Sequence, residues 1–511
     1  MGAGPYNTQP GCWSRRKGTM AELLNFINNL LRDSLLIYLL LGTSIWFTLR
    51  TGFIQIRHFC HTFTILKDSG TRGGGGISPF QALCTSLAAR IGCGNLMGVA
   101  IALILGGPGA IFWMWLAALI GMATAFAEST LAQLYKIRDD RGNACGGPAW
   151  YMANGLGLRW MGTLFTLFLL AGYGGFFSAV QANAITLSAQ QLSGMGRWPI
   201  TLALLILSAA AIFGGLRAIA RLTQWLVPII GIIYLLLAGW VVVHHWRQLA
   251  TVAALVFNSA FGLPEAASGL VGYGLAQAIF QGVQRGLFSN EAGTGSAPNI
   301  AAAAAPWPPH PASQGYIQML AVFIDTLVIC SATAAIILTS GTLEHAHADL
   351  HGIALINQAL ATVTGHWSMP LLMALVFVFS FAAIIGNYAY AESSLRFFVL
   401  QPMKLKWLLR LLTLTMILFG CVAEVSVVWR LADLAMGLMT ITNLIALLLL
   451  SPVVLMLAND YNSQRAIGKL PTFYAVNFPA IAPQLAPDLW GRPTASHQES
   501  SSTAAPKPLD R

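Results

Sequence analysis

The sequence predicts an all-α polytopic membrane protein with eleven transmembrane helices. Of its 511 residues, 56% are hydrophobic and 9% are charged, whereas a soluble domain carries about 25% charged residues. The apolar residues gather in eleven segments of membrane-spanning character, and two of these segments are interrupted by glycine and polar residues. These three observations exclude a soluble fold and indicate a chain whose main solvent is the lipid bilayer.

The eleven segments follow one another along the chain. A helix needs about 20 predominantly apolar residues to cross the hydrocarbon core, and most candidates approach or exceed this length. They are 33–50, 78–104, 109–135, 160–187, 199–215, 222–244, 270–300, 315–341, 368–398, 405–422 and 430–457. We expect 20–460 to form the transmembrane domain, 1–19 to be a disordered extension that precedes a start at Met20, and 461–511 to be a largely disordered cytoplasmic tail.

Positive charge is distributed unevenly between the two sides of the membrane. With the N-terminus outside, 19 of the 28 Lys and Arg residues fall on the cytoplasmic side and seven fall outside. Arg90 and Arg285 lie within spans. Because basic loops stay in the cytoplasm, we expect an N-out, C-in protein of a bacterial-type plasma (inner) membrane. The same bias explains the net charge of +10 without a nucleic-acid partner.

The second span contains the most unusual feature of the chain. Gly92-Cys93-Gly94-Asn95 interrupts an apolar stretch, and Arg90 stands two residues earlier. Broken helix survives in hydrocarbon only beside protein or a water-lined cavity, and a charge there costs roughly 2.5–3.5 kcal/mol. The segment therefore predicts a binding site at mid-membrane depth. A glycine-lined helix-packing face is the alternative.

The polar groups of this span suit a zwitterionic ligand. Backbone N–H groups at the positive end of a half-helix favour a carboxylate, and Gln81 and Asn95 add neutral donors and acceptors. Unwound carbonyls in the same segment can hold a small cation.

The seventh span carries the corresponding interruption. Arg285 and Glu291 flank a glycine-rich stretch, SNEAGTGSAPN (289–299), five spans after the first break. Five is odd, so corresponding helices of two five-helix units would run in opposite directions, which indicates an inverted-repeat transporter. The Arg285–Glu291 pair either caps a helix end at the cytoplasmic surface or gates the inner mouth of the pathway. Glu128, in the third span, is either a packing partner for hydroxyl groups or a counter-charge to Arg90.

No enzyme motif is present in the sequence. There is no P-loop, HExxH, GxSxG or cysteine–histidine cluster at metal spacing, and the seven cysteines are scattered. We therefore expect neither catalysis nor a cofactor, and energy from an ion gradient. No protein partner is implied.

Several of these motifs resemble one known family. GGPGAIFWMW (106–115), SPFQALCTSLAA with GCGN, RGLFSNEAGTGSA and HPASQGYIQMLAVFIDTLVIC (310–330) occur in the order found in the alanine/glycine:cation symporters. The resemblance covers about residues 20–460. It implies eleven spans, of which the second to eleventh form a five-plus-five inverted repeat, and import of alanine or glycine with a cation, most often sodium.

The resemblance also implies roles for individual residues. Gln81 and Asn95 would contact the amino acid, and the unwound Gly92–Gly94 backbone would hold its carboxylate. Phe177 and Phe280 would close a small pocket, and Asn387 in the ninth span would make that pocket more polar.

Two departures from the family pattern concern the coupling ion. Ala382-Ala383 stands where many members have Ser-Thr, whose hydroxyls help to bind sodium, and Arg90 stands where a small residue is more usual. We therefore consider the hypothesis that the Arg90 guanidinium replaces one sodium ion and meets the same carbonyls. A proton-coupled or uncoupled amino-acid transporter is then the alternative to sodium symport. A passive channel or facilitator is the rival in another class, but it would need a continuous polar pore.

Overall fold

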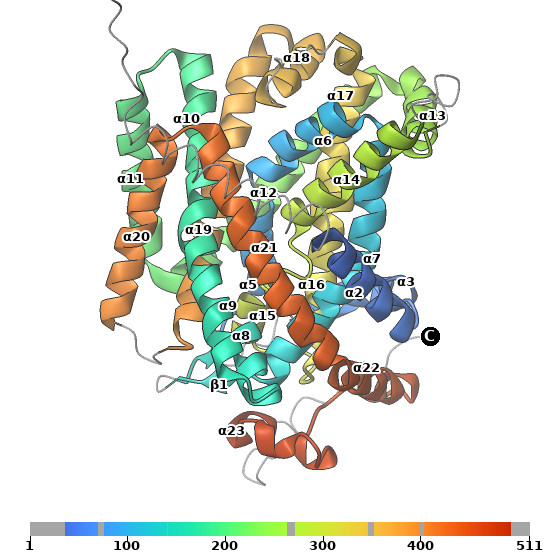
Figure 1. Cartoon of the computed structure of the whole chain (residues 1–511), viewed down its shortest axis with the longest axis vertical. Helices are drawn as coiled ribbons and strands as arrows, with labels where there is room; N and C mark the ends of the chain where they lie inside the picture. The colour runs from blue at the N-terminus through green and yellow to red at the C-terminus, as the bar shows by residue number, and fades with distance from the viewer. Residues whose placement is uncertain are drawn as a thin grey trace, which may run out of the picture.

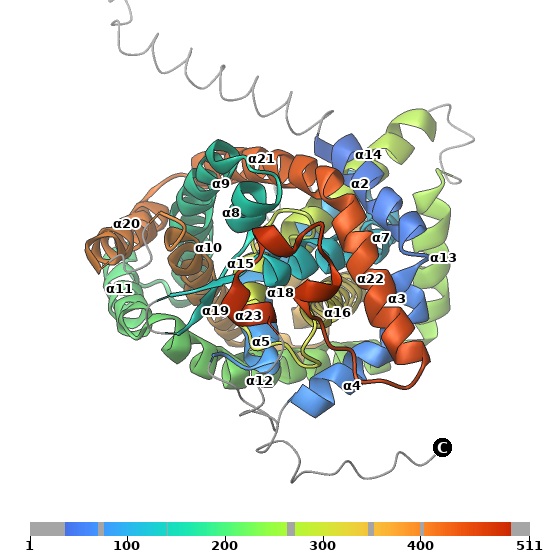
Figure 2. The same ribbon diagram turned by 90° about the horizontal axis from the view of Figure 1, so that it is seen from below.

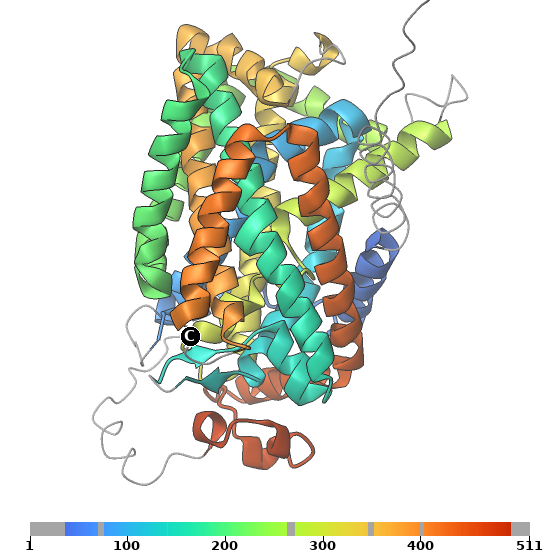
Figure 3. The same ribbon diagram turned by 60° about the vertical axis from the view of Figure 1, so that its left-hand side comes forward.

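The computed structural model describes residues 36–69, 76–139, 142–262, 271–345, 352–398 and 403–491. Within these ranges the chain forms a helical bundle whose long helices run roughly side by side (Figures 1 and 3). The predicted disordered extension at 1–19 lies outside the described residues.

The helices of the bundle agree with the predicted apolar segments. Their bounds are α2 Ile37–Arg50, α5 Pro79–Arg90, α6 Val99–Gly106, α7 Gly109–Leu134, α9 Arg159–Ala171, α10 Phe177–Ser193, α11 Arg197–Phe213, α12 Gly215–His244, α14 Val271–Asn290, α15 Pro298–Ala303, α16 Ala312–Val322, α17 Ser331–Thr339, α19 Ser368–Leu395, α20 Met403–Val422 and α21 Val425–Leu449.

Among the described residues, seven helices are long and apolar enough to cross a membrane, and an eighth span results if α5 and α6 are counted as one bent helix. The helices α2 and α11 are apolar but shorter. The protein is thus a multi-pass, mostly helical membrane protein, as predicted. The count of eleven spans and the inverted repeat remain predictions.

Three π-helical segments interrupt the long helices. They are η2 (Gly94–Gly98), η4 (Gly172–Phe176) between α9 and α10, and η7 (Phe323–Cys330) between α16 and α17. A π-helical turn widens the backbone and occurs frequently at functional sites. All three contribute residues to the site described below.

The helix α7 forms the centre of the bundle, and most of its residues are buried. Close packing against it depends on small residues. A Cβ atom at Gly282 of α14 would meet the Trp113 side chain at 2.7 Å, and one at Gly315 of α16 would meet Phe126 at 2.7 Å. Glycine at these positions lets the helix backbones approach each other, as is common in membrane bundles.

Several shorter elements lie outside the predicted spans. On the side of the bundle where α6 and α17 end, α13 (Leu249–Ala260) packs on α7 and α18 (Gly352–Thr364) packs on α17 and α19 (Figure 1). The remaining ones are α3 Ile54–Arg57, α4 Phe59–Ser69, α8 Pro148–Trp150, η3 Tyr151–Gly155, and the antiparallel hairpin of β1 (Ile137–Arg138) and β2 (Ala144–Cys145).

The C-terminal segment corrects one prediction. The chain after the last span was expected to be largely disordered from residue 461, but it is folded as far as Gly491. It forms α22 (Ser451–Ala466) and α23 (Pro487–Trp490) and crosses one end of the bundle (Figure 2). Trp490 is buried there and donates its indole N–H to the Leu134 carbonyl at 3.0 Å. The buried aromatic side chains of this segment, and not its polar composition, determine its order.

Candidate functional site

The second span is broken where the sequence predicts it. α5 ends at Arg90, and the chain bends by 56° before it continues through η2 into α6. The Gly92 N–H donates to the Asn95 side-chain oxygen at 3.2 Å, and the Cys93 N–H donates to Gln181 Oε1 of α10 at 2.9 Å. Side chains thus replace the helical acceptors that the break removes.

Asn95 links this break to two other helices. Its Nδ2 donates to Asp325 Oδ1 at 2.7 Å, and its backbone carbonyl accepts from Thr333 Oγ1 at 2.8 Å. Asp325 Oδ2 also accepts from Ser289 Oγ at 2.6 Å and from Thr326 Oγ1 at 3.0 Å. Because Ser289 lies at the end of α14, one carboxylate connects the two broken spans.

The second break runs from Asn290 to Ala297, between α14 and α15. Glu291, Gly293 and Gly295 have positive φ values of 55°, 84° and 82°. Such a conformation is disfavoured for a non-glycine residue, so the surrounding contacts must hold Glu291 in place. Its Oε2 accepts from Ser296 Oγ at 2.7 Å.

Glu128 of α7 holds the same break from the side. Its Oε2 accepts from the Gly295 N–H at 3.1 Å and from Asn443 Nδ2 at 3.0 Å. Asn443 Nδ2 also donates to the Gly293 carbonyl at 2.9 Å. The carboxylate is therefore part of the support of the unwound segment.

Arg90 is buried beside these acidic groups. Its side chain is 3% exposed, and none of its three guanidinium nitrogens has a hydrogen-bond partner among the described residues. The hydrogen bonds to carbonyls that we expected are therefore not formed. Glu128, Glu291 and Asp325 lie within the range of the electrostatic field of Arg90. The hydrogen bonds of Glu128 are with the Gly295 N–H and Asn443, so both interpretations of this residue, counter-charge to Arg90 and packing partner, stay open.

The ninth span, now α19, faces the first break as expected. A Cβ atom at Gly92 would lie 3.0 Å from the Ala383 Cβ, and one at Gly386 would lie 2.6 Å from the Ala89 nitrogen. Ala382, Ala383 and Asn387 are all buried. Methyl groups thus stand opposite the break where a hydroxyl would supply an oxygen ligand.

Gln81 and Asn95 are not brought together in this structure. Gln81 is the third residue of α5, where it forms a capping box with Ser78 and donates to Gln224 Oε1 at 3.0 Å. It lies nine residues before Arg90, roughly 14 Å along the helix axis. The glutamine at the break is Gln181, which the sequence analysis did not single out.

Of the two predicted aromatic residues, the structure places Phe177 near the first break. Phe177 stacks on Tyr173 and lies 5.6 Å from Phe288, measured between ring centroids. Phe288 is also the side chain that a Cβ atom at Gly94 would meet, at 3.2 Å. Phe280 instead packs with Ile37, on another face of α14. Phe288, two turns further along α14, takes its place at the break.

Arg285 and Glu291 lie inside the bundle. Both are at least nine-tenths buried, which does not fit a cap at the membrane surface. The Arg285 guanidinium carbon is 5.5 Å from the centroid of the Trp429 ring, and Trp429 lies 4.9 Å from Phe288. The arginine thus stacks on an aromatic group that continues to the first break.

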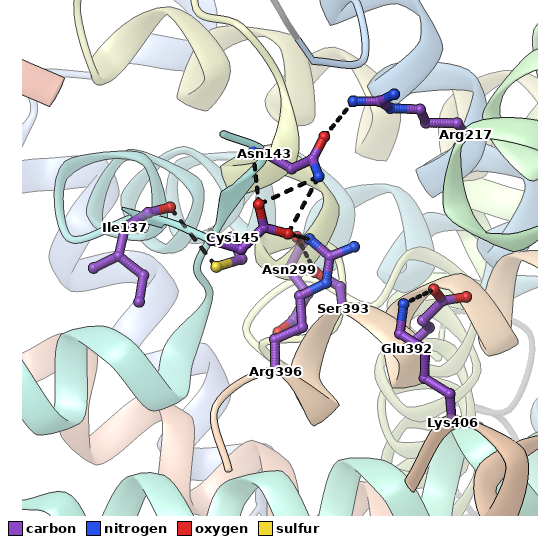
Figure 4. A network of polar contacts seen from close by, with 10 residues as sticks. Ile137, Asn143, Cys145, Arg217, Asn299, Glu392, Ser393, Arg396 and Lys406 are labelled. Carbon is purple, nitrogen blue, oxygen red and sulfur yellow. Dashed lines mark hydrogen bonds and ion pairs between the residues drawn. The ribbon is translucent and has the colours of Figure 1, made fainter. Parts of the chain in front are cut away.

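A cavity of about 290 Å³ lies at the end of the bundle that carries the β-hairpin. Its walls come from the beginnings of α5 and α12, the end of α15, the end of α19 and the hairpin. A polar network borders it (Figure 4), in which Asp139 accepts from Arg396, the residue directly after α19, at 3.4 Å and from the Asn143 N–H at 2.8 Å. Arg217 of α12 donates to the Asn143 side chain. The hairpin therefore connects α12 with α19.

Comparison with known proteins places the site in context. The model of the sodium:alanine symporter family matches residues 17–475. An uncharacterized transporter of Escherichia coli is 50% identical, with 92% of this chain and 99% of that protein covered. A probable sodium/glutamine symporter of Bacillus subtilis is 46% identical, with 89% of this chain and 93% of that protein covered. A sodium/alanine symporter of Methanococcus maripaludis is 36% identical, with 87% of this chain and 98% of that protein covered.

Proposed function

Because the chain belongs to the sodium:alanine symporter family, we propose that it imports a small neutral amino acid, alanine or glycine, together with sodium by alternating access. Members of this family are transporters and not enzymes. We further propose that the N-terminus is outside and the C-terminus is in the cytoplasm of an inner membrane, since the positive-charge bias supports this orientation.

The observation that carries the proposal is the contact between the two broken spans. Asn95 in the first break and Ser289 beside the second donate to the same Asp325 carboxylate, at 2.7 and 2.6 Å. A ligand held at one break therefore acts directly on the other, and discontinuous helices at a repeat interface are the usual substrate site of such carriers.

The size of the site supports a small substrate. A Cβ atom at Gly92 would lie 3.0 Å from Ala383, and one at Gly94 would lie 3.2 Å from Phe288. Only a small ligand group can therefore approach the backbone of this segment. Phe177 and Phe288 form the aromatic wall of this region. We assign the amino-acid backbone to the unwound Gly92–Asn95 segment.

The charges around Arg90 support a cation as co-substrate. The guanidinium of Arg90 balances one carboxylate, and each further carboxylate that is ionised adds an uncompensated negative charge. An uncompensated charge in the membrane interior is costly. A cation that enters with the amino acid would reduce this cost.

Arg90 and Ala383 also favour a second candidate, proton-coupled or uncoupled transport. The methyl group of Ala383 opposite Gly92 provides no oxygen ligand for sodium, and Arg90 already supplies one positive charge. Under this candidate, protonation of a carboxylate takes the place of sodium binding.

Uptake of labelled alanine into proteoliposomes distinguishes these candidates. Sodium and proton gradients are imposed separately, with no gradient as the control. We expect concentrative uptake with the sodium gradient. Concentrative uptake with the proton gradient alone would support the second candidate, and equilibration without concentration under either gradient would exclude both forms of symport.

The variant Arg90→Ala tests the role of the buried cation. We expect it to change the sodium concentration at half-maximal uptake, since it removes one of the charges with which the coupling ion interacts. The same uptake rate and ion dependence as the unsubstituted protein would show that Arg90 has a structural role only.

A further inference from the structure

A second cavity, of about 620 Å³, lies next to the hairpin and is also lined by Arg396. Its walls come from η3, from the first residue of α9, Arg159, and from the end of α19 with Arg396 and Phe397. Trp150 forms part of the wall and contacts Phe397 edge-to-face, with ring centroids 5.3 Å apart. The cavity thus combines two guanidinium groups with an aromatic wall.

The position of this cavity along α9 corresponds to the level of lipid headgroups. Trp160, the residue after Arg159, is 65% exposed, which is typical of a tryptophan at the membrane interface. One and two turns further along the helix, Leu164 and Leu167 are 36% and 52% exposed and continue an apolar surface into the hydrocarbon region. Arg159 therefore lies where acyl chains end and polar headgroups begin.

Both arginines have donors available for an anion. The Arg159 side chain has no hydrogen bond or ion pair with the part of the chain that the structure describes. Arg396 contacts Asp139 through one nitrogen at 3.4 Å and also meets the Cys145 thiol, but a guanidinium has five N–H donors, so donors remain for an anion. Each of the two guanidinium groups that line this cavity can donate charge-assisted hydrogen bonds to a phosphate.

We propose that this cavity binds the headgroup of an anionic phospholipid. The phosphate contacts Arg159 and the free edge of Arg396, while an acyl chain lies along Trp160 and Leu164. Basic pockets between membrane helices on the cytoplasmic side are suited to such headgroups, and the positive-charge bias predicts that this end of the bundle is cytoplasmic.

The same arrangement connects the lipid to the inner cavity. Arg396 lines both cavities and bonds to Asp139 of the hairpin network (Figure 4). A phosphate on one side of Arg396 competes with the Asp139 carboxylate on the other. Binding of the lipid thereby weakens the connection between the hairpin and α19.

Binding of phosphatidylglycerol to the purified full-length protein, measured by native mass spectrometry, tests the proposal. The variant is Arg159→Gln, and its matched control is Arg221→Gln, because Arg221 is also exposed and on the same predicted side of the membrane. We expect about fivefold weaker binding in R159Q, the effect of losing one basic contact near a membrane, and unchanged binding in R221Q. R159K should retain most of the affinity.

The zwitterionic lipid phosphatidylethanolamine carries the same phosphate without a net negative charge, so it is the comparison for headgroup charge and should bind more weakly than phosphatidylglycerol. The thermal unfolding temperature of each variant serves as the folding control. Equal losses in R159Q and R221Q would show a general surface-charge effect and overturn the proposal, as would unchanged binding in R159Q. Displacement of the lipid by equimolar inorganic phosphate would also overturn it. The readout does not involve transport, so it is independent of the proposed substrate and coupling ion.

Discussion

The hydrogen bond between Asn95 and Asp325 is the most direct test of the site. The variant Asn95→Asp keeps the shape of the side chain and the acceptor for the Gly92 N–H, but it replaces the Nδ2 donor by an oxygen. That oxygen would lie about 2.7 Å from Asp325 Oδ1, where the donor is now. Two ionised carboxylates at this distance repel each other, and a hydrogen bond between them would need a proton that neither group brings. Uptake is therefore measured at alkaline pH, where proton uptake by the pair is least favoured.

The magnitude follows from the bond that is lost. A hydrogen bond to a charged group contributes about 1.5–3 kcal/mol, which corresponds to roughly a 10- to 150-fold change in an equilibrium constant. We therefore expect the initial rate of alanine uptake in N95D to fall by at least about tenfold. Uptake into proteoliposomes with a sodium gradient measures this effect.

The double variant N95D/D325N restores the pair with the roles exchanged. The amide at position 325 donates to the carboxylate at position 95, and the total charge of the cluster is the same as in the unsubstituted protein. We expect partial recovery of uptake. N462D is the matched control, because Asn462 uses its Oδ1 as an acceptor from Tyr316 and aspartate preserves that contact. Normal uptake in N95D, or a double variant no better than N95D, would refute the reasoning.

Three further predictions concern the breaks and the C-terminal segment. In Gly92→Ala, the added methyl overpacks the first break, at a cost of about 1–3 kcal/mol. Uptake should therefore fall well below that of the control Gly98→Ala, in which the same methyl meets nothing within 4 Å. Equal uptake in the two variants would contradict the close approach of α19. Glu128→Gln removes one buried negative charge and weakens the acceptor of the Gly295 N–H. The sodium concentration for half-maximal uptake should therefore rise. An unchanged sodium concentration would exclude Glu128 from ion coupling. Burial, followed by the charge of Arg138, lowers the pKa of Lys136 from 10.5 to about 7. The unfolded chain then binds more protons than the folded one between pH 7 and 10.5, so stability rises with pH in this window. Lys136→Met should reduce this slope in a series of Tm measurements, whereas an identical pH profile would show that the amine is not buried in solution.

The positions of the helices could largely be predicted from the sequence. Apolar length and glycine interruptions are local properties, and the break at Gly92–Asn95 lies where they indicate. The α13 and α18 helices were missed because they are too short to read as spans. The folded C-terminal segment was missed because its order depends on a few aromatic contacts, such as Trp490 with Leu134, that join distant parts of the chain.

The structure brings together part of the proposed site. Asn95, Phe177 and the alanines of α19 lie at the break, as expected. Asp325 was overlooked, although a single acid within an otherwise apolar span was a usable signal. Gln81 was preferred to Gln181, and Phe280 to Phe288, because the choice between two like residues depends on which helix face points inward.

The sequence by itself determined that this protein is a membrane transporter with two broken helices, because the need to satisfy backbone hydrogen bonds in hydrocarbon restricts what a glycine-rich, charged interruption can be. Only the tertiary structure decided which groups meet there. The Asn95–Asp325 bond joins residues 230 positions apart, and Arg90 acquires three acidic neighbours from three other elements. Such contacts depend on helix rotation and packing, which hydrophobic patterns within one span do not specify.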